Sequence, residues 1–99
     1  MARIKPILPG EILEEEFLIP MGISAYRLAK DIKISATRVS EILKGKRRIT
    51  VDTALRLSKY FGNSVEFWVG IQTDYEIRKA RKYLESQLAE IQKLEEKIA

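Results

Sequence analysis

Three segments of this chain open with the same pattern, an isoleucine followed by a hydroxyl-bearing residue and an amphipathic stretch. The hydroxyl residues are Ser24, Ser35 and Thr50, and each can cap a helix by accepting a hydrogen bond from a backbone N–H of its first turn. The preceding isoleucine can pack on an apolar residue about one turn later, as in a hydrophobic staple. The pattern predicts helices over residues 24–32, 35–44 and 50–61. Because no segment alternates apolar and polar residues for long, a sheet is not expected.

Two further helices are predicted on either side of this series. Residues 11–18 form an acidic amphipathic segment after Pro9-Gly10, and the Pro-Met-Gly sequence at 20–22 ends it. Residues 65–98, which follow a capping serine, contain no proline and one glycine, so the last helix could run for 34 residues. Apolar residues recur there every seven positions, but most positions between them are polar, which is a weak coiled-coil pattern. The end of this helix is either a partner surface or a frayed tail.

The composition fits one small domain and excludes several classes of site. The chain has 99 residues, of which 45% are hydrophobic and 32% charged, so the prediction is a single all-α domain with an extended C-terminal helix. It has no cysteine and no histidine, which removes thiolate zinc sites and histidine-based nucleophilic catalysis. The acidic run Glu14-Glu15-Glu16 is a poor paired-carboxylate site, because consecutive helical residues point in different directions. We therefore expect no enzyme activity, metal or cofactor, and without a signal-peptide or membrane segment we expect a cytoplasmic protein.

The positive charge is concentrated in the middle third of the chain. Residues 24–60 hold ten Lys and Arg against three Asp and Glu, a net charge of +7, whereas residues 1–23 and 61–99 carry −2 and −1. A concentrated basic segment favours a polyanionic partner. The alternative from charge alone is an ordinary solvated helix surface.

The second and third predicted helices fit a helix-turn-helix. Ala29 is small enough to permit close approach of the following helix. In that helix, Val39, Ile42 and Leu43 lie within about 100° of arc at about 100° per residue, so they form its buried stripe. The polar face then points outward and suits entry into the major groove of DNA. Candidate base-reading residues on and beside that face are Thr37, Arg38, Ser40, Glu41 and Lys44.

These candidates suit particular base edges. Arg38 suits guanine, and Thr37 or Ser40 suits a polar edge or the thymine methyl group. Glu41 repels phosphate, yet it can accept from cytosine N4 or exclude wrong bases. Cations at the helix end and in the next loop suit the phosphate backbone, which positions a protein without reading sequence. The candidate phosphate contacts are Lys46, Arg47 and Arg48, with the backbone amides at the Ser24 cap.

The order of these motifs resembles that of HigA-type antitoxins, a group that includes VapI-like proteins. The resemblance opens at Pro9-Gly10-Glu11-Ile12-Leu13 and covers about residues 5–82. Further matching motifs are Leu28-Ala29-Lys30, Arg38-Val39-Ser40-Glu41-Ile42-Leu43, Gly45-Lys46-Arg47, Asp52-Thr53-Ala54-Leu55-Arg56-Leu57, Tyr60-Phe61-Gly62 and Glu66-Phe67-Trp68, with Gln72 and Tyr75. The resemblance is specific because the segments that flank the helix-turn-helix agree as well.

The resemblance implies a five-helix lambda-repressor-like domain of the Xre group over residues 1–82, followed by a helical extension over residues 83–99. It implies a homodimer that binds double-stranded operator DNA and represses its own operon. It also implies a protein partner, a HigB-type toxin that cleaves messenger RNA and is neutralised by the antitoxin. The family's DNA-facing positions fall on Thr37, Arg38, Ser40 and Lys44. The family's dimer contact falls on the fifth helix, where the candidates are Phe67, Trp68, Ile71 and Tyr75.

Two residues depart from the family pattern. Ala25 stands where a phosphate-contacting glutamine is usual, and Lys33 stands where the turn usually carries glycine. A lysine held in the left-handed conformation costs roughly 1 kcal/mol relative to glycine. Aromatic residues at helical spacing are usually core residues, which also makes Trp68 a core candidate, whereas Phe67 lies off that stripe.

Two alternative functions stay open at this point. A free-standing Xre-type regulator without a toxin would have the same DNA chemistry, and the neighbouring gene would separate the two. A protein-interaction module acting through the long last helix would bind DNA weakly and without sequence preference.

Overall fold

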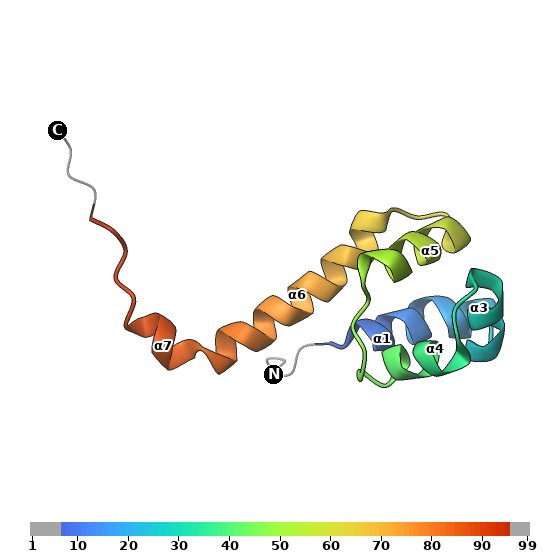
Figure 1. Ribbon diagram of the computed structural model, residues 1–99, viewed down its shortest axis with the longest axis horizontal. Helices are drawn as coiled ribbons and strands as arrows, with labels where there is room; N and C mark the ends of the chain where they lie inside the picture. Colours follow the sequence, from blue (N-terminus) through green and yellow to red (C-terminus); the bar gives the residue numbers. More distant parts are fainter. Residues whose placement is uncertain (1–6, 96–99) are drawn as a thin grey trace.

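The computed structural model describes residues 7–95 and is all-helical over that range. The elements in chain order are α1 (Pro9–Ile12), η1 (Leu13–Leu18), α2 (Ile19–Met21), α3 (Ala25–Ile32), α4 (Ala36–Leu43), α5 (Val51–Phe61), α6 (Val65–Tyr83) and α7 (Glu85–Ala89). The first three follow one another without a break, so the domain has the five helices predicted, and α7 follows them (Figure 1). The predicted all-α class is confirmed. None of the helices in residues 7–95 combines the length and hydropathy that a membrane crossing needs.

The first helix is longer than predicted and changes geometry along its length. It starts at Pro9 rather than at residue 11, and the segment before Pro20 is a π-helix in which the Ile19 N–H donates to the Glu14 carbonyl oxygen. Proline removes a backbone donor and its ring crowds the carbonyl four residues earlier, and a wider turn is one way for a helix to accommodate it. The helix ends at the left-handed Gly22.

Gly10 brings this first helix against the backbone of α4. A Cβ atom at Gly10 would collide with the Ile42 carbonyl oxygen and lie 2.8 Å from the Leu43 Cα. Only a residue without a side chain permits that approach. The N-terminal helix therefore supports α4 from behind.

The core lies where the first helix, α3, α4, α5 and the start of α6 meet. Its buried apolar residues are Leu13, Leu18, Leu28, Ala29, Ile32, Val39, Ile42, Ile49, Ala54, Leu57 and Trp68. The Trp68 ring lies 4.8 Å from the Phe17 ring, 5.0 Å from the Phe67 ring and 6.0 Å from the Phe61 ring, measured between centroids. This aromatic cluster joins the first helix, α5 and α6, so the three pack as one unit.

The last helix leaves the domain and ends earlier than the sequence suggested. α6 extends away from the other helices (Figure 1) and ends at Tyr83. The next residue, Leu84, leaves the helical conformation, with φ −99° and ψ 10°. A short α7 follows, and residues 91–95 have no regular structure. The prediction of one unbroken helix to Ile98 is therefore wrong over the described part, and its final positions, 96–98, lie outside the described residues. Without tertiary packing, helix formation depends on local propensity alone, which is marginal in water for short segments.

Candidate nucleic-acid interface

α3 and α4 form the predicted helix-turn-helix. The Ser24 and Ser35 hydroxyl oxygens each accept a hydrogen bond of 3.0 Å, from the backbone N–H of Arg27 and of Arg38. Between the helices, Lys33 has φ 65° and ψ 47°, so the turn keeps the left-handed conformation although its residue is not glycine. Both predicted caps are thus confirmed.

The predicted buried and exposed faces of α4 are largely as expected. Val39 and Ile42 are buried, and Leu43 is half-buried against the core. On the other side, six residues line one shallow hollow: Ala36, Thr37, Ser40, Glu41, Lys44 and Lys46. The structure thus brings together four of the five candidate base readers and one candidate phosphate contact. Lys44 and Lys46 take part in none of the ion pairs within residues 7–95.

Arg38, the remaining candidate base reader, turns inward. Its Nη2 donates to the Asp52 carboxylate at 2.9 Å and to the Thr53 hydroxyl at 2.8 Å, and its side chain is 28% exposed. Because Nη2 takes part in either two-pronged arginine geometry, a bidentate contact with guanine would require at least one of these two hydrogen bonds to break. The sequence missed this because helix arithmetic placed Arg38 beside the buried stripe without showing that α5 lies there.

The candidate phosphate residues divide into two groups. Arg47 forms an ion pair of 2.8 Å with Glu41, so the charge of Glu41 is compensated on the surface of α4. Arg48 instead donates to both carboxylate oxygens of Glu76 on α6, at 2.6 and 3.0 Å. This pairing lowers the pKa of Glu76 and raises that of Arg48. Arg48 therefore connects the α4–α5 loop to α6, which differs from the expected phosphate role.

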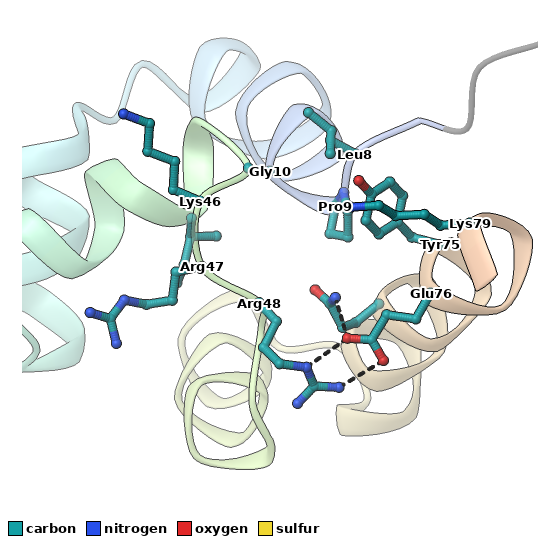
Figure 2. A pocket seen from close by; sticks show the side chains of 12 residues that line it. Leu8, Pro9, Gly10, Lys46, Arg47, Arg48, Tyr75, Glu76 and Lys79 are labelled. Atoms are coloured by element: carbon teal, nitrogen blue, oxygen red, sulfur yellow. Dashed lines mark hydrogen bonds and ion pairs between the residues drawn. The ribbon is translucent and has the colours of Figure 1, made fainter. Parts of the chain in front are cut away.

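Arg48 and Glu76 lie at a pocket of about 200 Å³ between the first helix, the α4–α5 loop and α6. Figure 2 shows these two side chains pointing toward one another, while those of Lys46 and Arg47 point away from them. Gln72 completes the contact: its side-chain amide donates to Glu76 at 2.9 Å, and its oxygen accepts from the buried Ile49 N–H at 2.8 Å. Buried polar groups need such partners, so this network fixes the path of the basic loop. The sequence signal for it was a lone glutamine on the apolar face of α6.

The four candidate dimer residues on α6 differ in exposure. Trp68 has no exposed surface, and its indole N–H donates to the Asn63 side-chain oxygen at 2.8 Å. Its assignment to an interface is therefore wrong, and it is a core residue. Phe67 is 38% exposed, and Ile71 and Tyr75 are half-buried, so these three keep surface for a partner.

The site contains one carboxylate that the sequence did not single out. The same Asp52 oxygen that accepts from Arg38 accepts from Arg56 at 2.8 Å. The hydrogen bonds, from Arg56 first, lower the pKa of Asp52. Arg56 continues to the turn, where its Nη1 donates to the carbonyl oxygens of Ile32 and Lys33 at 2.8 and 3.3 Å.

Known proteins with the same helices place this geometry in a family. The Helix-turn-helix family pattern matches residues 15–68. Virulence-associated protein I of Dichelobacter nodosus is 50% identical over 76 residues, which are 77% of this chain and 70% of that protein. The Pseudomonas aeruginosa antitoxin HigA, solved with the higBA promoter, superimposes with a TM-score of 0.87 at 41% identity, covering 91% of this chain and 99% of that one. A HigA-family addiction module antidote protein from Coxiella burnetii gives 0.86 at 44% identity, covering 92% and 100%. The chain therefore belongs to the Xre-type helix-turn-helix family, in the group that contains the HigA antitoxins and VapI.

Proposed function

We propose that this chain is a sequence-specific DNA-binding repressor that also serves as an antitoxin. It binds operator DNA of its own operon as a homodimer and neutralises a cognate mRNA-cleaving toxin. The observation that carries the DNA-binding part is the hollow at α4. There the short polar side chains of a capped helix lie beside Lys44 and Lys46, which follow the helix and form no ion pair within residues 7–95. A recognition helix in the major groove presents that combination of side chains.

The residues on this surface take different roles in the proposed complex. Thr37, Ser40 and Lys44 face the base edges, and Glu41 excludes bases that offer it no donor. Phosphate contacts come from Lys46 and Arg47 and from the first backbone amides of α3 at the Ser24 cap, where a helix N-terminus favours an anion.

The homodimer is proposed on geometric grounds. Two recognition helices about 34 Å apart read successive turns of one DNA face, and a single module buries little surface for tight specific binding. Phe67, Ile71 and Tyr75 on α6 are its proposed contacts. The division into a DNA-binding domain ending at residue 82 and an extension beyond it also remains a proposal, with α6 ending at Tyr83.

The antitoxin role is supported by relatives that are named antitoxins or antidotes. Its test is expression of the product of the neighbouring gene, alone and together with this chain. Growth arrest that this chain relieves, and co-purification of the two proteins, are the expected results. A neighbouring product that leaves growth unaffected, with no partner recovered, favours the free-standing regulator instead.

The DNA surface is tested with two lysine variants over a salt series. Lys46→Ala removes a cation beside α4, whereas Lys93→Ala removes the same charge from the exposed end of the described chain. We expect Lys46→Ala to weaken operator and scrambled DNA alike. It should reduce the slope of log K against log salt by about 0.9 per protomer, or about 1.8 for the homodimer. Lys93→Ala should match the wild type. Equal slopes for Lys46→Ala and the wild type would contradict the proposed surface.

A further inference from the structure

Asp52 is the second residue of α5, and its carboxylate joins α4 to α5. Its Oδ1 accepts from Arg38 of α4 at 2.9 Å and from Arg56 of α5 at 2.8 Å. Its side chain is 55% exposed, so burial does not hold it in place. The two arginine contacts define its position.

Each arginine makes a second contact that a simple surface ion pair lacks. Arg38 also donates to the hydroxyl of Thr53, which is 1% exposed. Arg56 also donates to the carbonyl oxygens of Ile32 and Lys33 at the end of α3. The last carbonyls of a helix lack partners within the helix and favour a cation, so Arg56 stabilises that end of α3.

The result is one continuous chain of contacts from α4 through Asp52 to the α3–α4 turn. Isolated exposed ion pairs contribute little because solvent screens them. A shared network couples its members, so the loss of one affects all. Without the carboxylate, two guanidinium groups would face each other with no anion between them.

We infer that Asp52 is a positioning residue for DNA recognition, which holds α4 in its reading orientation through Arg38 and Arg56. Arg38 then acts inside the protein, on Asp52 and Thr53, and not on a base. This inference rests on the proposed DNA-binding function. It assigns Arg38, the one arginine of α4, to orientation and leaves base reading to Thr37, Ser40 and Lys44.

The substitution Asp52→Asn separates two effects, because loss of orientation and loss of negative charge predict opposite changes in DNA affinity. Removing a negative charge makes the protein more attractive to any DNA, so electrostatics alone predicts equal or tighter binding. Loss of orientation predicts weaker binding to the operator only. The matched control is Asp74→Asn, which removes the same charge from an exposed i,i+4 ion pair with Arg78 on α6.

The experiment is fluorescence anisotropy with operator and scrambled DNA, at a temperature where each variant is folded by circular dichroism. We expect Asp52→Asn to lose about tenfold in operator affinity, the scale of one lost network contact, with scrambled DNA bound as well as before. Asp52→Glu keeps a carboxylate and should regain part of the loss. Asp74→Asn should bind both DNAs at least as tightly as the wild type.

Arg38→Ala provides a second way to break the same contact. We expect it to lower operator affinity without relaxing the preference at any single base pair. The double variant with Asp52→Asn should bind the operator no more weakly than the weaker-binding of the two single variants. Relaxed choice at one base pair in Arg38→Ala would make Arg38 a base reader and overturn the inference. So would an Asp52→Asn protein that binds the operator like Asp74→Asn. A wild-type protein that does not prefer its operator would overturn the proposed function itself.

Discussion

Lys33 offers a direct test of how the turn of the helix-turn-helix is built. It is the single non-glycine residue with a positive φ among residues 7–95. Its N–H donates to the Ala29 carbonyl, and the next N–H, of Ile34, donates to the same oxygen at 3.0 Å. These contacts are made by backbone atoms, and the side chain is exposed. Lys33→Gly therefore keeps every backbone contact of the turn and removes the side chain from the Cβ outward.

The expected gain follows from two opposing terms. A residue with a Cβ costs about 1–2 kcal/mol in the left-handed conformation. Glycine costs about 0.4–1 kcal/mol through the greater freedom of the unfolded chain. The net expectation is that Lys33→Gly raises the free energy of unfolding by about 0.5–1 kcal/mol. For a domain of this size, that is a rise in Tm of about 2–8 °C.

The assay is urea unfolding followed by far-UV circular dichroism, with Lys33→Ala as the control. Alanine removes the lysine charge but keeps the Cβ, so its free energy of unfolding should stay within about 0.5 kcal/mol of the wild type. Lys33→Gly should shift the midpoint upward with no change in the slope m. A glycine variant no more stable than the alanine variant would show that the turn is not strained.

Three further predictions concern stability. Gly10→Ala should lower the free energy of unfolding by about 1–3 kcal/mol, because the added Cβ strikes the backbone of α4; chemical denaturation measures it, and an unchanged midpoint would refute the close approach. Removing the chain beyond Tyr83 should leave the thermal transition of the domain in place, and its loss would show that the extension belongs to the core. Hydrogen bonds lower the pKa values of Asp31, Asp52 and Glu76, so their contribution is complete above the ordinary carboxyl pKa values of 3.8 and 4.5 and is lost as pH falls through the lowered ones. With no histidine in the chain, the midpoint should be flat between about pH 6 and pH 8, and a step there would contradict this assignment.

Local sequence signals predicted the starts of α3, α4 and α5 well. The hydroxyl oxygens of Ser24, Ser35 and Thr50 accept from backbone N–H groups at 3.0, 3.0 and 3.3 Å. A cap joins two residues that are three positions apart, so a short stretch of sequence is enough to predict it. The length of the last helix was overestimated because the absence of proline permits a helix without stabilising one. What stabilises α6 is packing of its first half, through Trp68, on the domain.

The exposed face of α4 was also predictable, because helical periodicity separates it from the buried stripe. The partners of its arginines were not. Arg38 meets Asp52 fourteen residues away, and Arg48 meets Glu76 twenty-eight residues away. Such pairs depend on how α5 and α6 pack, and no spacing rule within one helix indicates them.

In the proposed function, α4 reads a specific DNA sequence. The most direct test measures the affinity of the wild-type chain for the DNA upstream of its own gene and for a scrambled sequence, over a series of salt concentrations. We expect a preference of about a thousandfold or more for the upstream DNA, with affinity for both sequences falling steeply as salt rises. Equal and weak binding to the two sequences would contradict it.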